Sequence, residues 1–479
     1  MPSKRPERLI ALPRDPLALR AVADQVFSRT AGAPLVGGNR TRVLRDATEN
    51  YPAWSEAIAT ARQSIHVEMY IIHRDEVGAR FIAELAAKAR QGVAVRLIYD
   101  WFGCGVGPLL GLFTPLIRAG GEVRAFNPPV ISNALGWLRR NHRKLIVVDG
   151  AVAFVSGLCV GLQWQGRPEK GLEPWRDTGI EIAGPVVAHA EDAFAESWRM
   201  CGGRETDIAV QHSDASPGSV SLRLIPTEPF AGNLLRLDLL VTALARRSLW
   251  LTDAYFIGTG PYLESLRRAA ADGVDVRLLV PQDSDVGWTV QAARSLYRPL
   301  LEAGVRIFEW NGTMVHAKTA IADSRWARIG STNLNINSWF GNWELDVALE
   351  DEGVATLLES HYLEDLERST EVVLQTFRLP AIRPRTMDGP RRAPRRYRSS
   401  RRVVRAVTEM GRSIGAAVTG NRRLEEIEAM PVAGAALVLM VLGVVGFLAP
   451  ALLAWPIAAV AAWTAITFFV DAWALWRRR

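Results

Sequence analysis

The chain has 479 residues, of which 49% are hydrophobic, and a formal net charge of +7. This length suffices for two sizeable hydrophobic cores, and three cysteines are too few for a disulfide framework, which fits a reducing compartment. Residues 379–423 alone carry a net charge of +11, so the residues before them are net negative. A nucleic-acid-binding core is expected to be basic over a whole face, and the charge distribution argues against one.

The N-terminal part of the chain predicts a short extension followed by an α/β unit. Residues 1–36 contain charges and prolines but no long apolar run, so we expect no signal peptide there. Beyond them, apolar runs such as Ile65–Ile72 alternate with amphipathic stretches such as Gly78–Arg90. These patterns predict strands and helices, and therefore a mixed sheet covered by helices over residues 37–203.

The first unit contains a motif of His142, Lys144 and Asp149 beside an apolar run, Leu145–Val148. Strand alternation places the histidine and lysine on one face. An imidazole can attack or protonate, an ammonium can hold a phosphate oxygen, and a carboxylate can order the other two groups. Only five lysines occur in this arginine-rich chain, so a lysine here indicates a need for a compact point charge.

The second half of the chain repeats the first. Residues 204–219 have the composition of a linker, and residues 220–378 form the second predicted unit. The segment Gly92–Leu97 recurs as Gly273–Leu278, 181 residues later, after another amphipathic stretch at Gly260–Asp272. We therefore expect a duplicated α/β unit.

The second unit also repeats the motif, as His316, Lys318 and Asp323, with the predicted strand Thr319–Ala322 between them. Two copies of this spacing in a chain with seven histidines predict one site with two histidines. The other five histidines lack a lysine two residues later and are interpreted as structural or surface residues: His66, His73, His189, His212 and His361.

Polar residues follow the second motif. Ser331 and Asn333 lie in a stretch reading Gly-Ser-Thr-Asn, whose small and amide side chains could bind phosphate oxygens, and Glu344 supplies a further carboxylate. Without the motif upstream, this stretch would be interpreted as an ordinary turn.

Together, the two HxKxxxxD motifs, the Gly-Ser-x-Asn stretch and the strand Val67–Tyr70 resemble the phospholipase D superfamily and, within it, the bacterial cardiolipin synthases. The resemblance covers residues 38 to 378. It implies that the two units pack face to face around one site and that one histidine becomes a phosphohistidine. His142 would be the nucleophile and His316 the general acid and base, although the reverse assignment stays open.

The resemblance also implies roles for the neighbouring residues. Lys144, Lys318 and Asn333 would hold the phosphoryl oxygens, with Ser331 nearby. Glu344 would orient His316, and Asp177 would orient His142. The chain departs from the family pattern at Cys159, where many members have an asparagine. A thiol donates hydrogen bonds weakly, so we expect a looser first half of the site.

The chemistry predicted from these residues requires no metal and no other cofactor. Lysines supply the charge neutralisation that magnesium provides in other phosphoryl-transfer sites. The sequence has no Cys/His cluster with metal-ligand spacing and no phosphate-binding P-loop.

The C-terminal part predicts a membrane anchor. Residues 379–430 form an Arg-rich juxtamembrane segment, and residues 431–476 contain two apolar stretches of nearly the ~20 residues that cross a bilayer. They predict a transmembrane helical hairpin. Its basic flanks place the catalytic units on the cytoplasmic side of the cell membrane. Two loops before the first motif, Trp101–Phe113 and Asn127–Arg140, are candidate linings of the substrate entrance.

These observations favour a membrane-anchored phosphatidyltransferase that makes cardiolipin from phosphatidylglycerol and releases glycerol. Its partners would be phospholipid substrates and the membrane, and not nucleic acid. Two alternatives remain: a phospholipase D-type hydrolase that uses the same residues with water as the acceptor, and a weakly active membrane scaffold, which is suggested by Cys159.

Overall fold

A computed structural model describes residues 16–128, 139–204 and 215–374, together with Trp463. Apart from Trp463, these residues belong to one compact unit. The Arg-rich segment predicted at 379–430 lies outside the described residues, and so does the predicted helical hairpin at 431–476 apart from Trp463. Among the residues that are described, no helix combines the length and the apolar character needed to span a bilayer.

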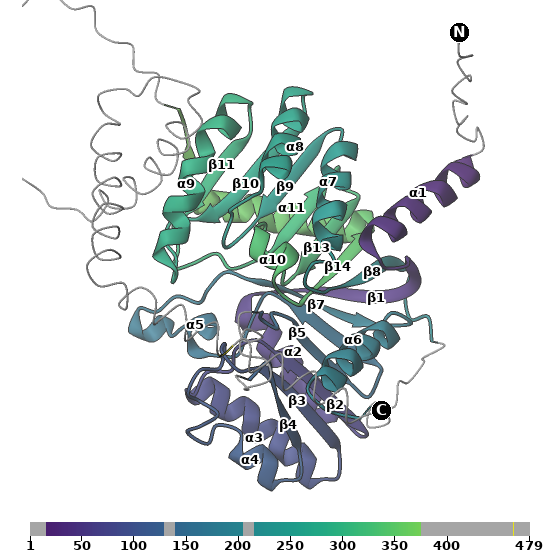
Figure 1. The fold of residues 1–479 in the computed structure, drawn as a ribbon, viewed down its shortest axis with the longest axis vertical. Coiled ribbons are helices and arrows are strands. Elements are labelled where there is room, and N and C mark those ends of the chain that lie inside the picture. The colour runs from purple at the N-terminus through teal and green to yellow at the C-terminus, as the bar shows by residue number, and fades with distance from the viewer. Residues whose placement is uncertain (1–15, 129–138, 205–214, 375–462, 464–479) are drawn as a thin grey trace, which may run out of the picture. The chain divides into compact units, whose positions relative to one another are not determined.

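The described strands join in one mixed sheet with a repeated order (Figure 1). The first half runs β1-β7-β6-β5-β2-β3-β4 from the centre outward, and the second half runs β8-β14-β13-β12-β9-β10-β11-β15. The strands of the first half are β1 Val36–Arg45, β2 Ser64–Met69, β3 Ala94–Asp100, β4 Glu122–Phe126, β5 Lys144–Val148, β6 Val152–Ser156 and β7 Thr178–Ala183.

The second half repeats this arrangement and adds one strand at the edge. Its strands are β8 Val220–Thr227, β9 Ser248–Thr252, β10 Asp275–Pro281, β11 Arg306–Trp310, β12 Thr319–Ala322, β13 Trp326–Gly330, β14 Glu344–Glu350 and β15 Ser369–Val372. Antiparallel pairing of β1 with β8 joins the halves, with an irregular register between Val36 and Asn39. The duplicated unit predicted from the sequence is therefore present, and its two copies share one continuous sheet.

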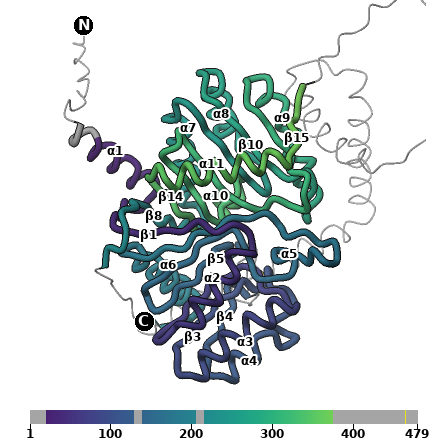
Figure 2. Tube along the Cα trace, turned by 180° about the vertical axis from the view of Figure 1, so that it is seen from behind, coloured from purple at the N-terminus to yellow at the C-terminus, as the bar shows by residue number. Residues whose placement is uncertain are grey.

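Helices cover both halves, as the views from the front and from behind show (Figures 1 and 2). The helices are α1 Pro16–Ala31, α2 Asp46–Thr60, α3 Glu76–Arg90, α4 Thr114–Arg118, α5 Leu162–Gln165, the 3-10 turn Pro168–Lys170, α6 Val187–Met200, α7 Asn233–Leu244, α8 Gly260–Ala271, α9 Gly287–Glu302, α10 Ile336–Phe340 and α11 Glu352–Glu367. Helices α6 and α11 contribute to a core that both halves share, including Phe194, Trp198, Leu358 and Tyr362.

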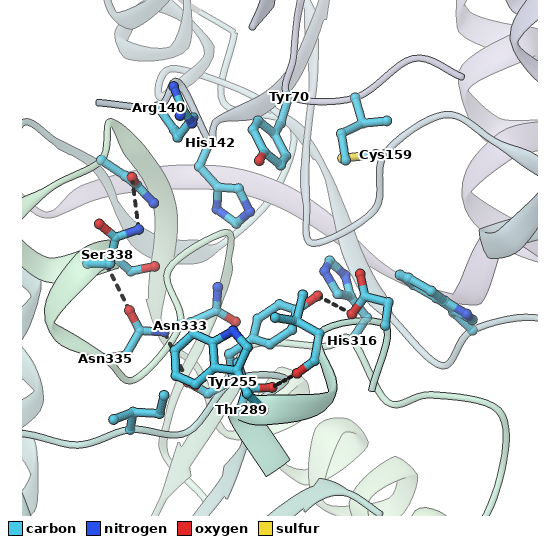
Figure 3. A pocket seen from close by; sticks show the side chains of 18 of the residues that line it. Tyr70, Arg140, His142, Cys159, Tyr255, Thr289, His316, Asn333, Asn335 and Ser338 are labelled. Atoms are coloured by element: carbon cyan, nitrogen blue, oxygen red, sulfur yellow. Dashed lines mark hydrogen bonds between the residues drawn. The ribbon is translucent and has the colours of Figure 1, made fainter. Parts of the chain in front are cut away.

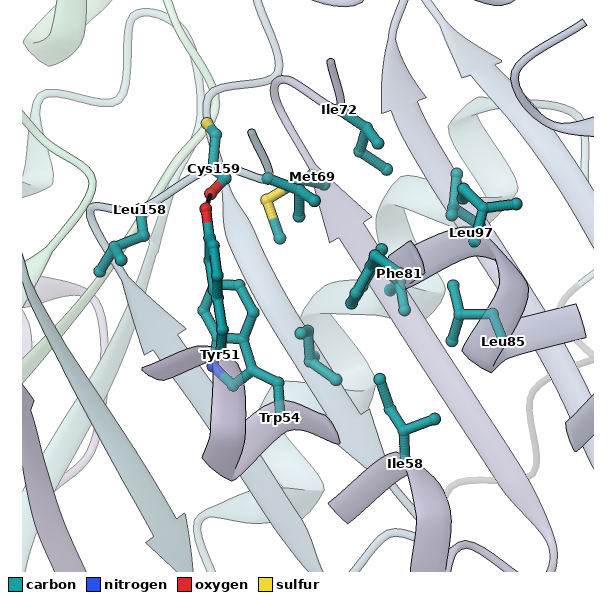
Figure 4. Close-up of a cluster of buried hydrophobic side chains, with 14 of the residues drawn as sticks. Tyr51, Trp54, Ile58, Met69, Ile72, Phe81, Leu85, Leu97, Leu158 and Cys159 are labelled. Carbon is teal, nitrogen blue, oxygen red and sulfur yellow. Dashed lines mark hydrogen bonds between the residues drawn. The ribbon is translucent and has the colours of Figure 1, made fainter. Parts of the chain in front are cut away.

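The first half has its own core beneath helices α2 and α3 (Figure 4). Trp54 and Ile58 of α2 pack there with Phe81 and Leu85 of α3, all of them buried. The hydroxyl of Tyr51 donates to the backbone oxygen of Cys159 at 2.7 Å. This bond fixes the backbone of Cys159 to the core on one side, while its side chain faces the region where the two halves meet.

Most predicted elements match the observed ones. The helix predicted at 78–90 begins slightly earlier, because Asp75 caps α3 by accepting from the backbone N–H groups of Val77 and Gly78. The strand predicted at 65–72 ends at Met69, where the chain leaves the sheet. Part of the predicted N-terminal extension forms α1, which packs against α7 of the second half.

Candidate active site

The two motif histidines lie just before equivalent strands, β5 and β12, and each is tied to the opposite half. The backbone N–H of His142 donates to the oxygen of Trp343 at 2.8 Å. The backbone N–H of His316 donates to the oxygen of Arg176 at 2.7 Å. These two backbone hydrogen bonds place the first residues of β14 beside His142, and the residues before β7 beside His316.

The same hydrogen bonds bring each histidine to a carboxylate of the other half. His142 Nδ1 lies 2.8 Å from Glu344 Oε2, and His316 Nδ1 lies 2.7 Å from Asp177 Oδ2. The predicted pairing within each unit, Glu344 with His316 and Asp177 with His142, is therefore wrong. Glu344 begins β14 and Asp177 directly precedes β7, and a backbone hydrogen bond ties the chain just before each acid to the histidine of the other half, so each acid meets the opposite histidine. In both pairs the carboxylate occupies Nδ1 and leaves Nε2 as the nitrogen free to react.

The two lysines are buried between the histidines and a tyrosine. Lys144 Nζ donates to the backbone oxygen of His142 at 2.7 Å and lies 5.1 Å from the ring centroid of Tyr70. Lys318 repeats this arrangement with the backbone oxygen of His316 and with the ring of Tyr255 at 5.8 Å. Each ammonium is therefore held beside an imidazole, where it can neutralise a phosphoryl oxygen.

The motif aspartates do not order the histidines and lysines, which corrects the prediction for Asp149 and Asp323. Each lies in a turn with a positive φ, +53° for Asp149 and +54° for Asp323. The carboxylate of Asp149 accepts from the backbone N–H groups of residues 62–64 at 2.7 to 2.9 Å. Asp323 does the same for residues 246–248. A short acid that tolerates this left-handed turn fixes the chain entering β2 and β9, and its role is structural.

Ser331 and Asn342 hold Glu344 in place. The Ser331 hydroxyl donates to Glu344 Oε2 at 2.6 Å, and the Asn342 amide donates to Oε1 at 3.1 Å. Ser331 is therefore a positioning residue for Glu344, the carboxylate that pairs with His142. The equivalent residue of the first half is Gly157, where an added Cβ would lie 2.2 Å from Asp177 Oδ1. A glycine is needed there because the carboxylate lies directly against the backbone.

The positions expected to hold phosphoryl oxygens differ between the halves. Asn333 is only 4% exposed, and its side-chain oxygen has no hydrogen-bond partner among the described residues. Cys159 takes the equivalent place in the first half and is fully buried. Burial raises the pKa of its thiol, which keeps it protonated at neutral pH. The site therefore has an amide on one side and a neutral, weakly polar thiol on the other.

These residues line one cavity of about 470 Å³ (Figure 3). Both histidines, Cys159 and Asn333 contribute to its wall, and so do residues of the loop before β14. Of the two loops expected to line the entrance, Arg140 belongs to the cavity wall, the residues of 101–113 do not, and residues 129–138 lie outside the described part of the chain.

Burial sets the protonation of the site. It lowers the pKa of both histidines to about 4, despite the neighbouring carboxylates. Burial together with Lys144 lowers the pKa of Lys318 to about 8. Burial alone would raise the pKa of Glu344 and Asp177, but the adjacent histidines and lysines outweigh it and lower both. At neutral pH the free site therefore holds two neutral imidazoles and two carboxylates.

Sequence reasoning missed the aromatic side chains around the histidines. The ring of Tyr70 lies 4.8 Å from that of His142, and the rings of Trp175 and Tyr255 lie 5.4 and 5.9 Å from that of His316. The repeat held only a weak signal for the tyrosines, because Tyr70 directly follows β2 whereas Tyr255 is the third residue after β9. In the described part of the chain, no three His, Cys, Asp or Glu side chains meet in a metal-binding geometry.

Comparisons with known proteins agree on the family. A family model described as cardiolipin synthase, PLD-like domain, matches residues 55–161 and 241–366, one segment in each half. The chain is similar to a cardiolipin synthase of Alkalihalophilus pseudofirmus, with 33% identity over 72% of this chain and 69% of that protein. It is also 33% identical to a cardiolipin synthase of Halalkalibacterium halodurans, over 73% of this chain and 70% of the relative.

Among solved structures, the fold is similar to that of phosphatidylserine synthase from Haemophilus influenzae. The TM-score is 0.58, the sequence identity is 14%, and the match covers 73% of this chain and 92% of the other. At this identity the likeness supports the α/β fold alone.

Proposed function

Because the chain belongs to the cardiolipin synthase family of phospholipase D-like proteins, we propose that it transfers a phosphatidyl group from phosphatidylglycerol to a second phosphatidylglycerol, releasing glycerol. The chain is a phosphatidyltransferase of this family. One observation carries the proposal: two buried imidazoles, each held at Nδ1 by a carboxylate of the opposite half, line one cavity.

The first half-reaction forms a phosphohistidine. The neutral Nε2 of His142 attacks the phosphorus, and the bond between phosphorus and the glycerol oxygen breaks. His316 gives its proton to the departing oxygen. In the free site this imidazole is neutral, but a bound phosphodiester anion favours its protonated form. Lys144 and Lys318 neutralise the charge that builds up on the phosphoryl oxygens.

The second half-reaction reverses these steps with a new alcohol. His316 takes the proton from a hydroxyl of the second phosphatidylglycerol, whose oxygen attacks the phosphorus and breaks its bond to His142. One phosphodiester replaces another, so the exchange needs no nucleotide. The membrane anchor in this proposal is the helical hairpin predicted at residues 431–476, with the catalytic halves on the cytoplasmic side.

The test is to follow the lipids by mass spectrometry when the full-length protein is reconstituted in phosphatidylglycerol bilayers. We expect equal amounts of cardiolipin and free glycerol. Phosphatidic acid as the main product would replace the proposal with a hydrolase, and absence of any lipid product would support a scaffold. Rapid denaturation in detergent at neutral to mildly alkaline pH, where a phosphohistidine bond survives, should trap labelled phosphatidyl on the wild-type protein and not on the His142→Ala variant, whereas the reverse assignment predicts loss with His316→Ala.

A further inference from the structure

An apolar loop projects from the first half between β3 and α4. Residues 101–113 contain no charged side chain. Large apolar side chains in this loop are strongly exposed: Phe102 is 51% exposed, Val106 66%, Leu109 80% and Leu110 57%. Single exposed apolar residues are ordinary, but a group of four on one short loop is typical of a surface that binds a protein or a membrane.

The base of this loop packs against the wall of the catalytic cavity. An added Cβ at Gly103 would lie 2.3 Å from the backbone oxygen of Tyr70 and 2.8 Å from its ring, so the two segments are in close contact. The guanidinium of Arg140 lies 4.0 Å from the ring centroid of Phe102. Tyr70 and Arg140 both line the cavity, and the apolar loop is therefore continuous with one side of its mouth.

The opposite side of the mouth also carries two exposed apolar side chains, which lie among polar residues that include the exposed Asp285. Trp288 and Ile336 belong to the second half, line the cavity and are each 61% exposed. Deeper in the same cavity lie His142, His316 and Asn333, all buried (Figure 3). The cavity therefore has buried polar groups at its floor and exposed apolar side chains at its rim, which matches the two ends of an amphiphile whose headgroup enters first.

We propose that this rim docks on the surface of a phospholipid bilayer, with Phe102, Val106, Leu109, Leu110, Trp288 and Ile336 entering the boundary between headgroups and acyl chains. The proposal rests on the proposed function, because it states how a lipid substrate reaches the site. It gives the catalytic halves a membrane contact of their own, separate from the predicted hairpin.

Charge favours a bilayer over a protein partner. No acidic residue occurs between Trp101 and Arg118, and Arg118 is exposed. Arg74 lies beside the loop, since its Cβ is 3.7 Å from the Cβ position built at Gly107. Arginines around an apolar tip suit a membrane surface with anionic headgroups such as phosphatidylglycerol.

The first experiment separates docking from chemistry. The full-length protein and a double variant, Leu109→Asp with Leu110→Asp, are each assayed on phosphatidylglycerol bilayers. They are also assayed in phosphatidylcholine vesicles with dissolved short-chain phosphatidylglycerol. We expect the double variant to lose about tenfold or more of its rate on bilayers and to stay within about twofold on the dissolved lipid. The matched control is Leu363→Asp on α11, which is 46% exposed and does not line the cavity.

Two results would overturn the docking surface: full bilayer activity of the double variant, or an equal loss on both substrates, which would assign the loop to the active site or the fold. If the wild-type protein turned over neither substrate, the proposed function would fail, and docking would be judged by a probe that needs no turnover.

That probe is an environment-sensitive fluorophore on Leu109→Cys in the reconstituted full-length protein. Brominated lipids should quench it, and should not quench the same fluorophore on Leu363→Cys. The unchanged protein, whose Cys104 and Cys159 are buried, supplies the labelling background. Absence of quenching at position 109, or quenching only by a nitroxide carried on a second copy of the chain, would contradict docking on lipid.

Discussion

The two halves place the same strands around the cavity but support their carboxylates differently. Glu344, which serves His142, also receives hydrogen bonds from Ser331 and Asn342. Asp177, which serves His316, lies against Gly157 and accepts from the backbone N–H of Thr178 at 2.8 Å. One carboxylate is thus held by side chains and the other by backbone. The duplicated fold gives two equivalent half-sites, and side-chain substitution makes their histidines unequal.

The comparison extends to the groups facing the substrate. Asn333 presents an amide to the cavity, and Cys159 presents a thiol at the equivalent position. Because amides form much stronger hydrogen bonds than thiols, we expect the second half to contribute more to phosphate binding. This difference teaches that a two-histidine site does not require two identical half-sites.

The largest effect is expected from removing either histidine. His142→Ala and His316→Ala should each lower cardiolipin formation by about 10³-fold or more, because nucleophile and proton donor act in series. Mass spectrometry of the lipids measures this rate. His189→Ala, on helix α6, is the matched control and should leave the rate within about twofold. A near-normal rate in either motif variant would mean that one half works alone.

The crossed pairing can be tested by a double-mutant cycle. Glu344→Gln should lower the rate by about 10²-fold, because the imidazole of His142 loses its orienting carboxylate. Added to His142→Ala it should cost nothing further, whereas added to His316→Ala it should reduce the residual rate again. The opposite pattern, in which Glu344 is coupled to His316 and not to His142, would show that each carboxylate pairs with the histidine of its own half.

The pH dependence sharpens the electrostatic comparison. Because His316 must be protonated to act as the acid and has a pKa of about 4 in the free site, kcat/KM should already decline with rising pH. Lys318, with a pKa of about 8, loses its charge above that pH, so the decline should become steeper there by about a further tenfold per unit. On the acid side, activity should be lost near pH 4, where His142 takes up a proton. Lys318→Arg should move the steeper alkaline decline in kcat/KM to higher pH. If the steeper decline stayed at the same pH, it would arise from the deprotonation of another group.

A smaller effect should separate the two phosphate-facing positions. Asn333→Ala should reduce kcat/KM by about tenfold, since it removes an amide from a buried phosphate site. Cys159→Ala should stay within about twofold, because a buried thiol contributes little hydrogen bonding. Steady-state kinetics on phosphatidylglycerol measure both. An equally large loss in Cys159→Ala would show that the thiol takes part in substrate binding.

The smallest effect on activity is expected at the motif aspartates. Asp149→Ala should lower the free energy of unfolding by about 1–3 kcal/mol, because three backbone N–H groups lose their acceptor. Asp149→Asn should lose less, since asparagine tolerates the same turn. Thermal unfolding measures stability, and the rate of the folded variant should stay within about twofold. A large fall in rate without a fall in stability would show that Asp149 takes part in catalysis.

Much of the fold was predictable because its signals are local. Apolar runs and amphipathic stretches located β5, β12, α3 and α8 within a few residues. The offset between repeated segments indicated the duplication, and the repeated spacing of His and Lys indicated the two-histidine site. Helix α1 was missed, because its packing against α7 joins residues far apart in the chain.

The sequence by itself determined which residue types form the site and that two copies of them exist, since spacing along a strand decides which face a side chain occupies. Only the tertiary structure decided which acid serves which histidine. Glu344 is 202 residues from His142, and Asp177 is 139 residues from His316. Their pairing depends on bridges between the halves, which no local pattern encodes. The motif aspartates acquired their structural role in the same way, through backbone groups more than 70 residues away.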